Sequence, residues 1–141
     1  MNTNFTLDFS VRDYECDMQG IVNNAVYQNY LEHTRHEFLH SQGLDFAELT
    51  REGVHMVVMR AEIDYLKALT SGDRFRVELR PQRKTRRKAI FYQQIVRSDD
   101  EAIMLKAKVL VGIVAGHPRA ELPPTIARLL ENFPQTPPVS T

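Results

Sequence analysis

The chain has 141 residues, the usual size of one domain, and its 43% hydrophobic and 26% charged residues exclude a disordered or fibrous protein. Eighteen Lys and Arg residues balance eighteen Asp and Glu residues, so no overall charge draws the molecule toward nucleic acid or an anionic membrane. The single cysteine, Cys16, excludes an internal disulfide. Because the sequence also lacks a basic and apolar leader and a long apolar run, we expect a cytoplasmic protein without a membrane span.

The first half of the sequence predicts a strand and then a long helix. Apolar residues alternate with polar ones over residues 5–11, which is typical of a strand with one buried face. Over residues 26–39 the apolar residues recur every three or four positions, the spacing of an amphipathic helix. Asn23 and Asn24 are favourable at a helix start and Gly43 at a helix end, so this helix is bracketed by its own boundary signals.

The second half of the sequence predicts a sheet. A short helix over residues 45–52, with Asp45 as its cap, precedes four strand-like segments. These segments are residues 54–66, 74–83, 89–97 and 102–114, and each connection between them is short enough for a hairpin or a meander. From about residue 117 the chain is rich in proline, with a short apolar helix over residues 126–133. The pattern predicts an α+β protein in which an antiparallel sheet of about five strands wraps around one long central helix.

Residues 11–39 resemble the signature of the 4-hydroxybenzoyl-CoA thioesterase family, in which an Asp is followed three residues later by Gly, then by Val and by a Tyr that opens a helix. Here these residues are Asp17, Gly20, Val22 and Tyr27. The resemblance continues over residues 57–73 and implies the family's hotdog fold, as a single domain over residues 1–141. It also implies an acyl-CoA thioester hydrolase that needs no cofactor, since coenzyme A is part of the substrate, and that assembles as a homodimer or homotetramer.

The sequence departs from the family pattern at several positions. Val26 stands where the family often has Asn, and Asn24 where it often has Tyr or His. Gln19 and Ile21 stand where the similar plant acyl-carrier-protein thioesterases carry Asn and His. A mechanism that needs a histidine in this loop is therefore not open to this chain. Ala68 replaces a Pro in the turn after the second strand, which affects local stiffness.

Asp17 is the candidate catalytic carboxylate. Thioester hydrolysis needs a nucleophile, or a base that activates water, together with donors for the oxyanion that forms at the carbonyl. Asp17 precedes the predicted helix, so its carboxylate can face a carbonyl held by the unsatisfied N–H groups near Asn24, while Gly20 lets the loop approach the substrate. An Asp before a helix is by itself more often a capping or turn residue, and the resemblance decides in favour of catalysis. By resemblance Asp17 is either the nucleophile that forms a mixed anhydride or the base.

Candidate substrate contacts lie in this loop, on the helix and along the second predicted strand. The side chains proposed to contact the acyl group or to orient water are Gln19, Tyr27, Val57, Met59 and Tyr65. The basic run over residues 83–88 supplies Arg83, Arg86 and Arg87, a residue type that holds phosphates such as those of coenzyme A. A solvated turn and a non-specific nucleic-acid contact are the other interpretations of this run, and the zero net charge disfavours the second. An aryl and an aliphatic acyl group both stay open.

Other chemistries find less support. Cys16 is not paired with a base, and lone cysteines are usually small buried apolar residues. His33, His36 and His40 recur at helical spacing near Glu37 and could hold a metal ion on one face of the predicted helix. Mixtures of His and Glu on a helix more often form a solvated face, so we expect no metal. Two alternative functions remain, a hotdog hydratase that uses these side chains and a non-catalytic acyl-CoA or nucleic-acid binder. We expect dimerisation through the sheet, with the active site near the subunit boundary.

Overall fold

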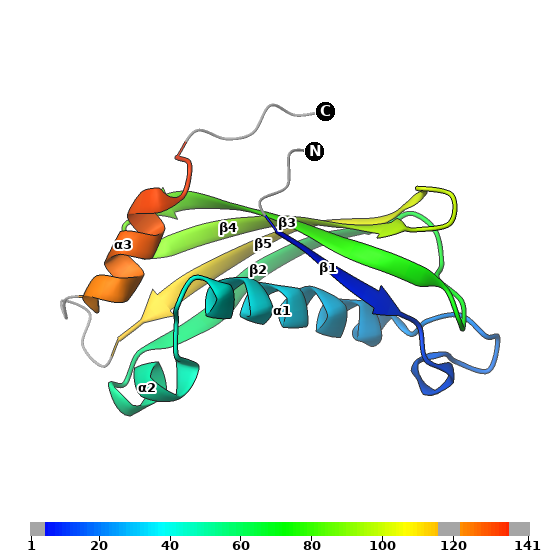
Figure 1. Cartoon of the computed structure of the whole chain (residues 1–141), viewed down its shortest axis with the longest axis horizontal. Coiled ribbons are helices and arrows are strands. Elements are labelled where there is room, and N and C mark those ends of the chain that lie inside the picture. Colours follow the sequence, from blue (N-terminus) through cyan, green and yellow to red (C-terminus); the bar gives the residue numbers. More distant parts are fainter. Residues whose placement is uncertain (1–4, 116–121, 136–141) are drawn as a thin grey trace.

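The computed structural model describes residues 5–115 and 122–135 of the chain (Figure 1). In chain order the elements are β1 (Phe5–Ser10), the short 3₁₀ turn η1 (Asp13–Glu15), α1 (Asn24–Ser41), α2 (Phe46–Arg51), β2 (His55–Tyr65), β3 (Arg74–Thr85), β4 (Lys88–Arg97), β5 (Ile103–Val114) and α3 (Pro124–Asn132). The predicted order of one strand, a long helix, a short helix, four strands and a last helix is confirmed. No helix in the described part of the chain is long and apolar enough to cross a membrane.

The five strands form one antiparallel sheet in the order β1-β3-β4-β5-β2. The connection from β2 to β3 is as short as predicted but forms no hairpin, because the two strands lie apart and β2 is at the edge beside β5. The connection after β2 crosses the end of the sheet, where Leu66 and Lys67 donate their N–H groups to the carbonyl of Met104. Hydrophobic periodicity indicates that a segment is a strand, but it carries no information about which strand pairs with it.

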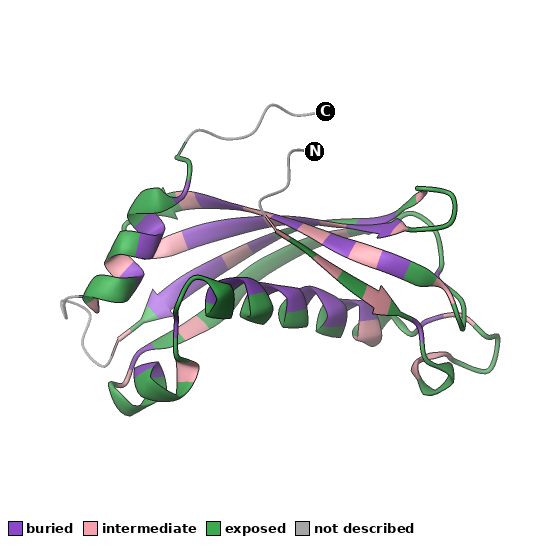
Figure 2. Cartoon of the chain, viewed as in Figure 1, coloured by how far each residue is buried: buried purple, intermediate pink, exposed green. Residues whose placement is uncertain are grey.

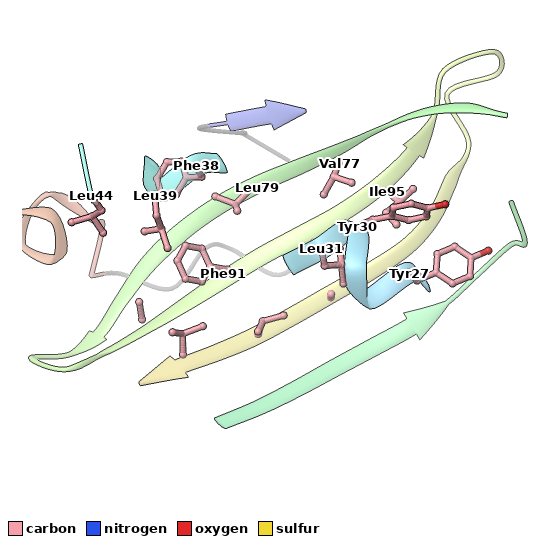
Figure 3. Packing of buried hydrophobic residues seen from close by; sticks show 14 of the residues in the cluster. Tyr27, Tyr30, Leu31, Phe38, Leu39, Leu44, Val77, Leu79, Phe91 and Ile95 are labelled. Carbon is pink, nitrogen blue, oxygen red and sulfur yellow. The ribbon is translucent and has the colours of Figure 1, made fainter. Parts of the chain in front are cut away.

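Helix α1 lies across one face of the sheet and buries only the side that faces the strands (Figure 2). Figure 3 shows Phe38 and Leu39 of this helix over Leu79 and Phe91 of the sheet, and the rings of Phe38 and Phe91 are 6.2 Å apart. Full burial of such a side chain contributes about 1.5–3 kcal/mol. The α1 side of the sheet is therefore the core, and we call it the inner face.

The ends of α1 show which boundary signals act. Gly43 has a φ of 90°, its N–H donates to the carbonyl of His40 at 3.0 Å, and Leu44 N–H donates to the carbonyl of Leu39 at 3.3 Å. This pair of bonds is a Schellman motif, so the predicted terminator is confirmed. At the other end Asn23 occupies the N-cap position with extended backbone, but its side chain makes no capping hydrogen bond. The prediction of side-chain capping by Asn23 is therefore wrong, and among the described residues no side chain accepts the first N–H groups of α1.

Helix α3 closes one end of the core. Phe133 directly follows it, and its ring centroid lies 6.0 Å from that of Phe38 and 6.3 Å from that of Phe91. Arg83 N–H donates to the carbonyl of Pro134 at 2.8 Å, which ties this segment to β3. The part of the proline-rich tail that the structure describes thus packs as core, and the rest of that tail lies outside the described residues.

Candidate active site

Asp17 lies in a tight loop between η1 and α1. Cys16 and Val22 form an isolated antiparallel bridge, and the N–H of Asp17 donates to the carbonyl of Ile21 at 2.8 Å. The turn closes where Gly20 N–H donates to the carbonyl of Asp17 at 3.0 Å. Gly20 has a φ of 80°, in the left-handed region that side chains with a Cβ rarely adopt. The loop motif therefore needs a glycine three residues after the aspartate for a conformational reason.

Buried neighbours hold this loop against the sheet. Val22 N–H donates to the carbonyl of Leu69 at 3.0 Å, and Ile21 forms a bridge with Thr70. Tyr27, which is 3% exposed, accepts the N–H of Leu69 on its hydroxyl oxygen at 2.9 Å. Burial raises the pKa of the Tyr27 hydroxyl, and the bond from Leu69 opposes that rise. The structure thus places Tyr27 in the support of the loop, and its predicted substrate contact stays a prediction.

The two carboxylate oxygens of Asp17 have different surroundings. Oδ1 accepts the N–H of Gln19 at 2.8 Å and that of Ile21 at 3.4 Å, so it holds the turn together. Oδ2 has no hydrogen-bond partner among the described residues, and the side chain is exposed. The Asp17 side chain can therefore hold the turn and also react, because the hydrogen bonds to Oδ1 fix the orientation of Oδ2. Gln19 contributes its backbone to this arrangement and is itself exposed.

The first turn of α1 lies beside this carboxylate in the chain. Asn24 is the first helical residue, and no side chain within the described ranges caps the helix start. Exposed N–H groups at a helix start, together with the helix dipole, favour an anion or a carbonyl oxygen that is gaining negative charge. Only Asn23 lies between Val22, at the base of the loop, and the first helical residue, and the pairing of Asp17 with donors near Asn24 stays a prediction.

The register of β2 places the predicted substrate contacts of that strand on opposite faces of the sheet. Tyr65 lies on the inner face, 44% exposed, with its ring centroid 5.6 Å from that of Tyr27. Val58 is opposite the buried Val111 and also faces inward, whereas Val57 is opposite Gly112 and faces outward.

Met59 shares the outward direction of Val57. The strand register shifts around this residue, and its side chain lies against Gly112, where an added Cβ would come within 2.5 Å of the Met59 sulfur. The outer face lies away from α1, so the structure does not bring Val57 and Met59 together with Asp17. Alternate side chains of a strand point to opposite faces, and on that rule Met56 and Val58 are the residues that face the helix.

The predicted phosphate contacts lie at the other end of the molecule. Arg86 and Arg87 form the turn between β3 and β4, next to α3 (Figure 1). Arg83 and Arg86 line a hollow of about 700 Å³ between this turn and α3. The 18 residues of α1 separate the two ends, which corresponds to about 27 Å of helix. Within one chain the basic turn and Asp17 are therefore not parts of the same site.

Comparison with known proteins assigns the family. A family model described as the thioesterase-like superfamily matches residues 11–130, which include the Asp17 loop, α1, α2, the strands β2 to β5 and most of α3. The chain belongs to the thioesterase-like superfamily. The resemblance to a thioesterase family that the sequence predicts is thus confirmed. The matched region contains the signature residues Asp17, Gly20, Val22 and Tyr27.

Two curated relatives illustrate the similarity of this superfamily member to proteins of known activity. It is 38% identical over 102 residues to an acyl-acyl carrier protein thioesterase of Arabidopsis thaliana, covering 72% of this chain and 54% of that protein. The chain thus spans about half the length of the Arabidopsis relatives it matches. It is 31% identical over 122 residues to a 1,4-dihydroxy-2-naphthoyl-CoA hydrolase of Picosynechococcus, covering 79% of this chain and 84% of that protein.

Solved structures of other proteins share the fold of this superfamily member. A hypothetical protein of Aquifex aeolicus is 28% identical, with a TM-score of 0.78 over 89% of this chain and 98% of that chain. A 1,4-dihydroxy-2-naphthoyl-CoA thioesterase from Synechocystis is 18% identical, with a TM-score of 0.82 over 91% of this chain and 96% of that chain. The predicted hotdog fold is confirmed.

The remaining candidate groups of this thioesterase-like chain lie apart from one another. Burial raises the pKa of the Cys16 thiol, and the neighbouring carboxylates of Asp13 and Asp17 act in the same direction, which disfavours a thiolate nucleophile. His33 contacts the ring of Phe9, whereas His36 lies 3.8 Å from Glu32. Among the described residues, no three His, Cys, Asp or Glu side chains converge as metal ligands would.

One residue that the sequence analysis missed is Arg35. It lies on the buried side of α1 and is 8% exposed. Its Nη1 donates to Oε1 of Gln93 at 3.0 Å, and Nε2 of Gln93 donates to the carbonyl of Leu31 at 3.0 Å. The signal was present in the sequence, because Arg35 falls four residues after Leu31 and three before Phe38, within the apolar stripe of the helix.

Proposed function

We propose that the chain hydrolyses acyl-coenzyme A thioesters, with Asp17 as the catalytic carboxylate and the N–H groups around Asn24 as oxyanion donors. The observation that carries this proposal is the carboxylate itself: one oxygen is fixed by its own turn, and the other has no hydrogen-bond partner among the described residues, in the loop that leads into a helix whose N-cap side chain makes no capping bond. The names of the two curated relatives support it, since one is a thioesterase and the other a CoA-thioester hydrolase.

The reaction divides between these groups. The carbonyl oxygen of the thioester lies on the first turn of α1, where the N–H groups stabilise the negative charge of the tetrahedral intermediate. Asp17 Oδ2 either attacks the carbonyl carbon, forming a mixed anhydride that water then cleaves, or accepts a proton from a water that attacks directly. In both routes the C–S bond breaks, the thiol of coenzyme A leaves, and the carboxylate of Asp17 is restored. Loss of one oxyanion donor costs about a hundredfold to a thousandfold in comparable enzymes.

We also propose that two chains pair through β2. This strand bonds only to β5, so one of its backbone edges is open among the described residues. Large apolar side chains on and beside it are exposed, namely Val57 at 40%, Val58 at 51%, Met59 at 52%, Tyr65 at 44% and Leu66 at 52%. An open edge with apolar side chains favours pairing with another strand, and a two-fold axis gives antiparallel pairing of β2 with its own copy.

This pairing joins the two ends that one chain keeps apart. Antiparallel alignment of the two β2 strands reverses the second chain, so the end of α1 that carries Asp17 in one chain lies level with the α3 end of the other. The phosphates of coenzyme A would then contact the Arg83, Arg86 and Arg87 side chains of the second chain, while the thioester reaches Asp17 of the first. The 700 Å³ hollow between the basic turn and α3 is large enough for such a group.

The test is thiol release from a panel of acyl- and aroyl-CoA esters by the wild type and by Asp17→Asn. Asparagine keeps the acceptor that Gln19 N–H needs, so we expect an unchanged melting temperature and assembly with at least a hundredfold lower kcat. Asp99→Asn, an exposed carboxylate in the turn after β4, is the matched control and keeps full activity.

Two results would contradict the proposal. If folded Asp17→Asn is as active as the wild type, this carboxylate does not do the chemistry. If the wild type releases thiol from no ester, hydration of enoyl-CoA esters and salt-dependent nucleic-acid binding are the activities to measure next, because they separate the hydratase from the binder.

A further inference from the structure

A groove follows the seam between α1 and β2 on the inner face of the sheet. Two hollows of about 260 and 180 Å³ share Glu32, Arg35 and Val58 in their walls. The smaller hollow includes Gln28, about one turn beyond the start of α1, and the larger reaches His55 beside α2. The groove thus runs along α1 from about one turn beyond its start to Leu39, near its other end.

Most of the residues that line this groove are apolar. Side chains of this kind come from both layers of the fold and include Leu31, Leu39, Ala61, Ile63, Val109 and Val111. Such walls suit the hydrocarbon chain or ring of an acyl group.

Among the polar residues of these walls, which also include Gln28, Glu32, His36, Thr50 and His55, Arg35 is the one that is buried. Arg35 is only 8% exposed. Within the described residues its guanidinium makes one hydrogen bond, to Oε1 of Gln93. No carboxylate of those residues lies within ion-pair distance of it. Burial lowers the pKa of Arg35, and the charge of the more distant Glu32 opposes that shift.

A buried guanidinium with open donors is costly unless an acceptor completes it. Gln93 fixes the position of the group, because its amide bridges Arg35 and the carbonyl of Leu31. A guanidinium presents a rigid fork of N–H donors that matches a carboxylate and also bonds a hydroxyl oxygen. Because Arg35 lines both hollows, a molecule that enters the groove can offer an acceptor to the guanidinium donors that Gln93 does not use.

We infer that Arg35 is a specificity-determining residue that binds an oxygen atom of the acyl group, carried as a hydroxyl or a carboxylate beyond the thioester carbonyl. The inference rests on the proposed function, because it takes the groove as the acyl-binding part of that site. Arg35 follows Asn24 by eleven residues, about 16 Å along the helix, and helical side chains lean back toward the helix start. The oxygen therefore lies partway along the acyl group, and a plain hydrocarbon offers no acceptor to the donors that Gln93 does not use.

Thioethers of coenzyme A test this inference without hydrolysis. Matched thioethers of graded chain length, ending in a methyl, a hydroxyl or a carboxyl group, are titrated calorimetrically into the wild type. We expect at least one oxygen-bearing thioether to bind about tenfold or more tightly than its methyl counterpart, because a site built around a polar group rejects ligands that leave it unpaired. The stronger of the hydroxyl and carboxyl series identifies the oxygen.

Arg35→Met should reduce this preference to about twofold or less and should bind the methyl series at least as well as the wild type does. Arg80→Met is the matched control, since Arg80 lies on the outer face, over the ring of Tyr92 at 5.3 Å, and its loss leaves the preference unchanged. If Arg35→Met fails to fold because Gln93 loses its partner, Arg35→Met with Gln93→Leu removes both polar groups and gives the same reading.

The outcomes separate the two proposals. Equal binding of all three series by the wild type, or a preference that survives in folded Arg35→Met, overturns the inference. A variant that keeps the preference but no longer dimerises also overturns it and assigns Arg35 to a subunit contact. A preference for oxygen in a protein that releases thiol from no ester refutes hydrolysis and leaves the role of Arg35 in binding intact.

Discussion

The proposed dimer makes a prediction about mixed subunits that one chain alone cannot satisfy. If each site combines Asp17 of one chain with the basic turn of the other, a variant in Asp17 and a variant in the basic turn repair each other when they share a dimer. The variants are Asp17→Asn and the double variant Arg83→Ala with Arg86→Ala. The backbone bond from Arg83 N–H to Pro134 persists in the double variant, because alanine keeps the N–H.

The expected size of the effect follows from the charges. A hydrogen bond to a charged group contributes about 1.5–3 kcal/mol, and exposed arginines such as Arg86 fall at the low end, so each substitution raises KM about tenfold. The double variant then shows KM about a hundredfold higher with a similar kcat, because phosphates lie far from the reacting carbonyl. At substrate concentrations near the wild-type KM, each variant alone is nearly inactive.

Mixing the variants in equal amounts under conditions of subunit exchange recovers activity. About half of the dimers are then mixed, and each mixed dimer has one intact site and one site with both defects, so thiol release returns to about a quarter of the wild-type rate. If the basic turn acts within its own chain, every site keeps one defect and no activity returns. Mixing without recovery, when exchange has been verified by mass, refutes the shared site.

Three further predictions concern stability and assembly. Leu31→Ala removes a side chain that is 1% exposed and should lower the free energy of unfolding by about 2–5 kcal/mol in urea titrations, whereas the exposed neighbour Gln28→Ala changes it little. Gly20→Ala should lower the free energy of unfolding by about 1–2 kcal/mol, because Gly20 has a φ of 80°, and should also lower kcat. Gly20→Asn should lower the free energy of unfolding less, since Asn tolerates this backbone region. Equal losses of stability in the two variants would show that backbone strain is not the cause. Val57→Lys on the open strand should yield monomers in sedimentation velocity and abolish thiol release, whereas Ile103→Lys, on β5 rather than on the open edge, keeps the dimer.

The sequence by itself determined the features that depend on neighbours in the chain. The order of the elements was predicted correctly because periodicity and boundary residues act over a few positions. Gly43 ends α1, and Asp45 caps α2 by accepting the N–H groups of Ala47 and Glu48 at 3.0 and 3.2 Å. The spacing between Asp17 and Gly20 is equally local, since one tight turn accounts for it.

Tertiary structure decided which strands pair and which way their side chains face. The sequence pattern of β2 does not show that it leaves β3 and pairs with β5, because the pairing energy is shared with residues about fifty positions away. The register shift at Met59 then turns Val57 outward and Val58 inward, although both are apolar. A shift of one residue moves every following side chain of a strand to the opposite face of the sheet. The sequence alone therefore does not show which of two adjacent apolar residues faces the core.

The same distinction applies to Asn23 and Arg35, because residue type alone does not fix what their side chains contact. Asn23 has the residue type of a helix cap but makes no side-chain capping bond, which leaves the first turn of α1 open for the proposed oxyanion. Arg35 has the residue type of a solvated face but is buried beside Gln93, 58 positions later in the chain. Local preference is worth about 1 kcal/mol per residue, and packing against distant residues overrides it. The tight turn from Asp17 to Gly20 therefore depends on neighbours in the chain, whereas the groove beside Arg35 arises only where α1 meets the sheet.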